Sequence, residues 1–65
     1  MIKSAIRTPN DMVMVFDEDG EQIPEYQGCY DEVKELVLVN APPGTLFGRW
    51  LDYKTDIETV SRNDW

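Results

Sequence analysis

The chain has 65 residues, of which 13 are acidic and 6 basic, for a net charge of −7, and it contains one cysteine and no histidine. A chain of this length forms a single domain, residues 1–65, with a thin margin of stability because it buries only about 60% of the surface that its unfolded form exposes. The composition excludes an internal disulfide and argues against a structural zinc site, which needs several Cys or His ligands.

The negative charge is concentrated in the middle of the chain. Residues 17–35 contain eight acids and one lysine, whereas the charges of the two flanking segments cancel. Such a field repels phosphate backbones and acidic membrane surfaces, so we expect no direct binding of nucleic acid or membrane. The simplest interpretation of the acidic segment is a solvated surface.

The sequence also bears on location. The N-terminal residues Met1-Ile2-Lys3-Ser4 lack the apolar stretch of a signal peptide. The longest apolar run has five residues, far short of the roughly 20 that a membrane-spanning helix requires. A single thiol is typical of a reducing compartment. We therefore expect a cytoplasmic protein, or one inside a particle assembled in the cytoplasm.

The first half of the chain has the pattern of strands and turns. Residues 2–7 alternate in polarity, as a half-buried strand does, and Thr8-Pro9-Asn10-Asp11 follows as a turn. Proline excludes a tight type I′ hairpin there, so we expect a slightly longer connection. The apolar pentad of residues 12–16 has turn residues on both sides and predicts the central strand around which the fold is organised.

A second hairpin is predicted at Asp19-Gly20, where glycine supplies the positive φ of a type I′ turn or a G1 bulge. Its second arm is expected over residues 21–26. In a two-residue turn Ile23 faces Phe16, and with a G1 bulge it faces Val15; the sequence leaves both registers open. Pro24 places this arm at a sheet edge or makes it leave the sheet early.

A helix is predicted from Cys29 to Ala41, ended by Pro42-Pro43-Gly44. At 100° per residue one side holds the apolar residues together with Asn40, and Leu38 and Val39 fall outside this stripe. Either these two residues contact a partner, or residues 36–39 form a short strand after a single helical turn. The predicted stripe consists of Cys29, Tyr30, Val33, Leu36, Val37, Asn40 and Ala41.

The last third again predicts strands. Residues 45–53 alternate, with Gly48 marking a bulge or a close approach of another side chain. Lys54-Thr55-Asp56 is the expected turn, residues 57–62 the last strand, and residues 63–65 a polar tail that ends in a tryptophan.

The predicted fold is α+β: a small, mostly antiparallel sheet of four to five strands with one helix packed on a face, in the order ββ(β)αββ. One helix covers only one face of a sheet. We therefore expect the other face to show part of Met12, Met14 or Trp50 to solvent, which is a reason to expect a homodimer or a bound partner.

No catalytic, cofactor or metal site is predicted. Aligning Gly20 with the sixth position of an EF-hand loop puts Val15 and Tyr26 where oxygen ligands are needed, so that calcium motif fails. Cys29 lacks a histidine base, and its place on the apolar side of the helix predicts a buried core residue. We expect no enzyme and no cofactor.

The residues that we expect to bind a partner protein are Leu38, Val39 and Trp65, together with the acids Asp17, Glu18, Asp19 and Glu21. A terminal tryptophan docks either on its own domain or on another one, and we assign it to an interface. The preferred function is a small, acidic, non-enzymatic protein–protein interaction module. The alternative is an acidic nucleic-acid mimic that occupies a basic groove on a host protein.

The chain also resembles a group of small uncharacterised proteins from bacteriophages and integrated mobile elements of Gram-positive bacteria. The resemblance implies expression in a bacterial cytoplasm, as an accessory protein of a phage or mobile element, and it assigns no functional residue. It is carried by Ile6-Arg7-Thr8, Met12-Val13-Met14-Val15-Phe16-Asp17-Glu18, Gly20-Glu21-Gln22, Pro24-Glu25, Gln27-Gly28, Tyr30, Val33, Ala41-Pro42 and Trp50.

Overall fold

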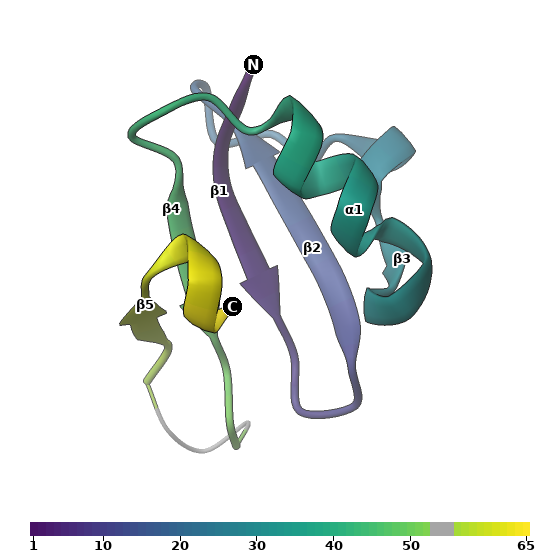
Figure 1. Ribbon diagram of the computed structural model, residues 1–65, viewed down its shortest axis with the longest axis vertical. Coiled ribbons are helices and arrows are strands. Elements are labelled where there is room, and N and C mark those ends of the chain that lie inside the picture. The colour runs from purple at the N-terminus through teal and green to yellow at the C-terminus, as the bar shows by residue number, and fades with distance from the viewer. Residues whose placement is uncertain (53–55) are drawn as a thin grey trace.

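The computed structural model of the chain describes residues 1–52 and 56–65. In this part of the chain five strands, one α-helix and two short 3-10 helices follow one another (Figure 1). Their bounds are β1 (Ile2–Arg7), β2 (Met12–Asp17), η1 (Pro24–Tyr26), β3 (Gly28–Cys29), α1 (Tyr30–Asn40), β4 (Leu46–Arg49), β5 (Glu58–Val60) and η2 (Arg62–Asp64).

The strands form one sheet in the order β3-β2-β1-β4-β5. Neighbouring strands are antiparallel except β1 and β4, which run parallel because α1 carries the chain across the sheet between β3 and β4. Figure 1 shows α1 and η2 in front of the same face of the sheet. The predicted α+β fold, a mostly antiparallel sheet with a helix on one face, is thus confirmed.

The apolar pentad lies in β2, an interior strand paired with β1 on one side and β3 on the other. Val13 and Val15 are 2% and 0% exposed and point toward the side of α1, where they form part of the core. The remaining core residues come from β1, from α1 and the residue that follows it, from β4 and from the C-terminus. They are Ile2, Ala5, Tyr30, Val33, Val37, Ala41, Phe47 and Trp65.

The first hairpin has the longer connection that the proline predicts. The Thr8 N–H donates to the Met12 carbonyl at 2.8 Å and closes a loop of three residues, 9–11. Asp11 has a φ of +58°, the left-handed conformation that ends such a loop with a G1-type bulge.

The second hairpin resolves the register that the sequence leaves open. The Asp17 N–H donates to the Glu21 carbonyl at 2.9 Å, and Gly20 takes the positive φ of +81°. The Ile23 N–H then donates to the Val15 carbonyl at 2.9 Å, which is the register of the G1 bulge.

The predicted second arm of that hairpin is not a continuous strand. After an isolated bridge between Phe16 and Gln22 the chain turns into η1, which has proline at its start. Pro24 has no N–H for a sheet ladder, so the chain leaves the sheet there. It returns as β3, whose Cys29 and Gly28 pair with Met12 and Val13.

The helix spans Tyr30–Asn40, which excludes a short strand over residues 36–39, but its buried side differs from the predicted one. Leu36, predicted inside the stripe, is 46% exposed. Leu38, predicted outside it, packs against the core. Arg62 of the C-terminal segment donates from Nη1 to the Leu38 carbonyl at 3.1 Å.

The last two strands are shorter than predicted, with β4 confined to residues 46–49 and β5 to residues 58–60. Tyr53, at the end of the predicted fourth strand, and Lys54 and Thr55 of the predicted turn lie outside the described residues. Thr45 precedes β4 and donates from its hydroxyl to the Ile2 carbonyl at 3.0 Å, which helps align the beginnings of β1 and β4.

Candidate functional site

The sheet has a face that none of its described helices covers, and we call it the open face. Ala5, Val15 and Phe47 are paired across adjacent strands and are buried on the side of α1. Because successive side chains of a strand point to opposite sides, their strand neighbours point away from α1. The strand pairing therefore assigns Ser4, Ile6, Met12, Met14, Phe16, Cys29, Leu46, Gly48 and Thr59 to the open face.

None of the described residues that the pairing assigns to the open face is charged, but the exposed Lys3, at the register shift between Ile2 and Ser4 in β1, adjoins this face. Met12 and Leu46 are 38% and 56% exposed, and Ile6, Met14 and Phe16 are half-buried by their neighbours. A sheet face that stays in water is normally rich in polar and charged side chains. The composition of the open face is instead typical of a surface that another molecule covers.

Gly48 has no side chain, so the backbone of β4 is covered at this point of the open face by the side chains of neighbouring residues. A Cβ atom at this position would lie 2.7 Å from Ile57 Cγ2 and 3.0 Å from Ile6 Cδ1. The two isoleucine side chains therefore close over the glycine from the open side, and Ile57, 44% exposed, joins the apolar surface. This is the close approach of side chains that the sequence allows for at Gly48.

The prediction that the uncovered face shows part of Met12, Met14 or Trp50 agrees with the structure for the two methionines, since the pairing assigns both to this face and Met12 is exposed and Met14 half-buried. Sequence reasoning missed Leu46 and Ile57. Their contribution depends on the parallel pairing of β4 with β1, which no local pattern in the sequence signals.

Cys29 is exposed, contrary to the prediction of a buried core residue. The helix begins one residue later, at Tyr30, so Cys29 belongs to β3 and precedes the helix. It is paired with Met12, and its side chain therefore lies at the edge of the open face.

Trp65, which we expected at an interface, is buried in its own domain with 3% of its surface exposed. Its indole Nε1–H donates to the Gly48 carbonyl at 3.1 Å, and its ring packs on Tyr30 and Phe47 with centroid distances of 5.4 and 5.0 Å. The expectation failed because the short η2 turns the chain back over the core. Trp65 is therefore part of the core and not of a free surface.

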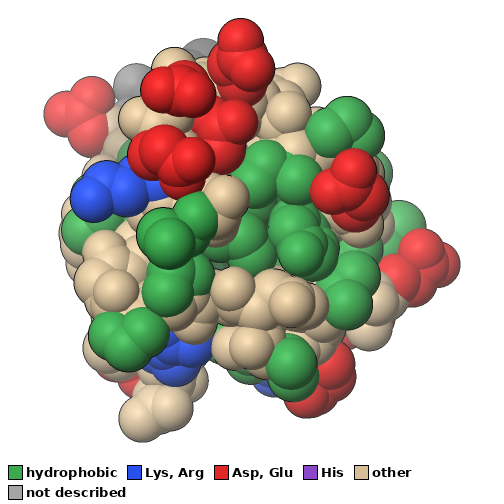
Figure 2. Space-filling model, turned by 90° about the horizontal axis from the view of Figure 1, so that it is seen from above, with side chains coloured by type: hydrophobic (Ala, Val, Ile, Leu, Met, Phe, Trp, Pro, Cys, Tyr) green, Lys and Arg blue, Asp and Glu red, His purple; other side chains and the backbone are tan. Residues whose placement is uncertain are grey.

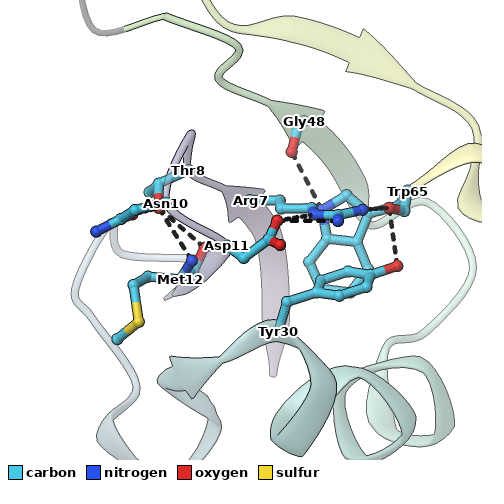
Figure 3. A network of polar contacts seen from close by, with 8 residues as sticks. All are labelled: Arg7, Thr8, Asn10, Asp11, Met12, Tyr30, Gly48 and Trp65. Atoms are coloured by element: carbon cyan, nitrogen blue, oxygen red, sulfur yellow. Dashed lines mark hydrogen bonds and ion pairs between the residues drawn. The ribbon is translucent and has the colours of Figure 1, made fainter.

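Two side chains hold the main-chain oxygen of Trp65 (Figure 3). The Tyr30 hydroxyl donates to it at 2.9 Å and Arg7 Nη1 at 3.1 Å. The Arg7 guanidinium also stacks over the Tyr30 ring, 3.7 Å from its centroid, and pairs with the Asp11 carboxylate at 2.9 Å. These contacts connect β1, α1 and the C-terminal segment in one structural network.

The structure brings the four predicted acids together at the tip of the second hairpin, residues 17–21, which we call the acidic tip. The Asp17 carboxylate accepts from the N–H groups of Asp19 and Glu21, both at 2.9 Å, and so fixes the loop. Glu18, Asp19 and Glu21 are exposed. Among the residues that the structure describes, no cluster of three or more His, Cys, Asp or Glu side chains is arranged to hold a metal ion.

The other predicted partner residues lie on α1. Val39 is 80% exposed, whereas Leu38 is half-buried against the core. The C-terminal end of α1 and the acidic tip lie at the same end of the molecule, near the N-terminus (Figure 1). Figure 2 views this end and shows hydrophobic side chains at its centre with Asp and Glu side chains along its margin.

No pocket opens in the described part of the chain. Within residues 1–52 and 56–65, no helix has the length and apolar character needed to cross a membrane. No protein-family model, curated protein or solved structure matches the chain.

Proposed function

We propose that the chain is a small, acidic, non-enzymatic module that binds another protein through the open face of its sheet. The resemblance to small phage and mobile-element proteins supports the setting of this proposal, an accessory protein in a bacterial cytoplasm. The observation that carries the proposal is the composition of the open face. It exposes Met12, Leu46 and Ile57, and the residues that the strand pairing assigns to it are uncharged; the exposed Lys3, at the irregularity of β1, adjoins them.

Burial of this face is energetically favourable because transfer of apolar surface out of water yields about 25 cal/mol per Å². The face is also wide, since the pairing of β2, β1 and β4 places Met14, Ile6 and Gly48 side by side across three strands. The absence of a pocket in the described chain fits a protein partner, which binds flat surfaces, better than a small ligand, which needs a concave site.

The test is a capture experiment with two matched variants. Immobilised wild type, the open-face variant Met12→Ser with Leu46→Ser, and the helix variant Leu36→Ser with Val39→Ser are exposed to the same bacterial lysate. Each variant replaces two exposed apolar residues and leaves the net charge unchanged. Circular dichroism and thermal melting establish that both variants fold.

We expect wild type and the helix variant to retain the same proteins and the open-face variant to lose them. If the open-face variant retains the same proteins as wild type, the proposal is wrong. If the helix variant alone loses them, the docking surface is the exposed side of α1 around Val39.

The acidic nucleic-acid mimic remains a second proposal. It is favoured by the exposure of seven of the eight acids in residues 17–35, the exception being the half-buried Asp17. A mimic binds mainly through charge, so its captured partner should be released by high salt and be indifferent to the serine substitutions on the open face. A partner bound by the open face should instead be lost when Met12 and Leu46 are replaced by serine.

A further inference from the structure

The acidic tip borders the open face. Phe16 is the last residue of β2 that points to this face, and the chain continues from it directly into the tip. Because the Asp17 carboxylate anchors the N–H groups of Asp19 and Glu21, the tip is a fixed loop and not a mobile tail. The uncharged surface therefore ends at a group of exposed carboxylates.

Another acid, separate from the acidic tip, lies beside the part of the open face around Gly48. Asp56, exposed, immediately precedes Ile57, whose side chain covers Gly48. Asp11, next to Met12, differs because its carboxylate is already paired with Arg7 at 2.9 Å. The open face thus has an apolar centre and exposed carboxylates at its margins, of which Glu18 lies 3.5 Å from the N-terminal ammonium of Met1.

We infer that the occupant of the open face is a basic amphipathic helix of another protein, with apolar residues against the sheet and Lys or Arg beside the acidic tip. This inference rests on the proposed function and specifies the partner. A helix is the element that covers the opposite face of this same sheet, and layered helix-on-sheet packing is a standard way to bury a sheet face. The basic residues follow from charge complementarity with the margins.

Charge argues against two alternative occupants of the open face, a second copy of the chain and a nucleic acid. A second copy of the chain also carries a net charge of −7 and has the same acidic tip beside its open face, and like charges oppose close association. A nucleic acid is repelled by the acidic tip. A basic helix is attracted to the tip and can cover the apolar centre.

The probe is a synthetic peptide that forms an amphipathic helix with leucines on one side and lysines on the other, compared with the same peptide carrying glutamates in place of the lysines. Binding to the full chain is followed by fluorescence anisotropy of the labelled peptide. Sedimentation of the protein alone, over the same concentrations, measures self-association.

Two matched pairs of variants separate the apolar and the charged contributions. The open-face variant and the helix variant used for the proposed function remove equal numbers of exposed apolar side chains. Glu18→Gln with Glu21→Gln removes two charges from the acidic tip, and Glu32→Gln with Glu35→Gln removes two charges from α1, so that the net charge changes equally.

We expect the lysine peptide to bind wild type and the glutamate peptide not to bind. Affinity should fall about tenfold in the open-face variant, because about 1.4 kcal/mol of apolar contact corresponds to that factor, and should be unchanged in the helix variant. The glutamine pair at the tip should weaken binding about threefold or more relative to the pair on α1.

Several results would overturn the inference. Equal losses from both glutamine pairs, with no effect of the open-face variant, mean that the peptide responds only to total charge. A dimer in sedimentation that the open-face variant abolishes means that the occupant is a second copy. Failure of the proposed function is distinguishable, because only then does the open-face variant capture the same cellular proteins as wild type.

Discussion

Tyr30 and Arg7 hold the C-terminal residue of the described chain in place, and both do so through the main-chain oxygen of Trp65. The tyrosine bond is 2.9 Å long and buried. Because the same oxygen also accepts from Arg7, removal of one donor leaves the acceptor bonded. The network therefore tolerates the loss of one bond, at a cost near the net value of a single hydrogen bond.

We predict that Tyr30→Phe lowers the free energy of unfolding by about 0.5–1.5 kcal/mol, because it removes one hydrogen bond without creating a cavity. Urea unfolding, followed by tryptophan fluorescence, measures the change. Tyr26→Phe serves as a control for loss of a hydroxyl away from Trp65. A loss for Tyr30→Phe no larger than that of the control contradicts the role of the bond.

The space available above the backbone at Gly48 determines whether the protein tolerates a side chain there. We predict that Gly48→Ala destabilises the protein by about 1–3 kcal/mol, because the added methyl group would overlap Ile57 Cγ2 at 2.7 Å. This Cγ2 is attached directly to the β-carbon and therefore has little freedom to move away.

A double-mutant cycle tests this prediction at its cause. Ile57→Ala removes the obstructing methyl group, so Gly48→Ala should cost measurably less in the Ile57→Ala background than in wild type. Equal costs in the two backgrounds, measured by urea unfolding, would place the origin of the effect elsewhere.

Residue-scale expectations from the sequence failed at Cys29 and Trp65 for the same physical reason. Both lie at ends of elements, where one residue of shift or one turn of chain decides between core and surface. Periodicity fixes the faces of an element and not where the element starts. The hairpin acids were placed correctly, because Gly20 defines the loop that carries them.

At the scale of elements, α1 shows how far a helical period determines burial. The period correctly assigned Tyr30, Val33 and Val37 to the core. It assigned Leu36 to the apolar stripe and Leu38 to the outside, whereas in the structure Leu36 is 46% exposed and Leu38 packs against the core. A helical period does not include what packs around the helix. Here Arg62 of the C-terminal segment donates to the carbonyls of Leu38, Ala41 and Pro42, at and beyond the end of α1.

We predict that Leu38→Ala lowers the free energy of unfolding by about 1–3 kcal/mol and Leu36→Ala by less than about 1 kcal/mol, since only Leu38 packs against the core. The two variants delete the same atoms from neighbouring positions of the same helix. Thermal or urea unfolding of both, under one set of conditions, gives the comparison. The reverse ranking would mean that the helix is rotated relative to the sheet.

The strands were predictable to different degrees. β1 and β2 follow from alternation and from the apolar pentad, and their connection follows from proline. The arm after the second hairpin was predicted as a strand because its residues alternate, but Pro24 removes it from the sheet after one bridge. The parallel pairing of β4 with β1 is a long-range contact, and no local propensity encodes it.

At the scale of the whole molecule, the fold is one sheet with its helices on one side. The imbalance between a covered and an uncovered face was predictable from the presence of a single predicted helix. The identity of the exposed side chains required the strand order.

The central claim is that a partner docks on the open face, and the methionines provide the most direct measurement. The sequence has three, of which Met12 and Met14 lie on the open face and Met1 precedes β1, 79% exposed. In a protein with ¹³C-labelled methionine methyl groups, titration with the lysine peptide should shift the resonances of Met12 and Met14. Met1, whose ammonium lies 3.5 Å from Glu18 of the acidic tip, reports contact of the peptide with the tip. Binding of the peptide that leaves the resonances of both Met12 and Met14 unchanged would contradict the account.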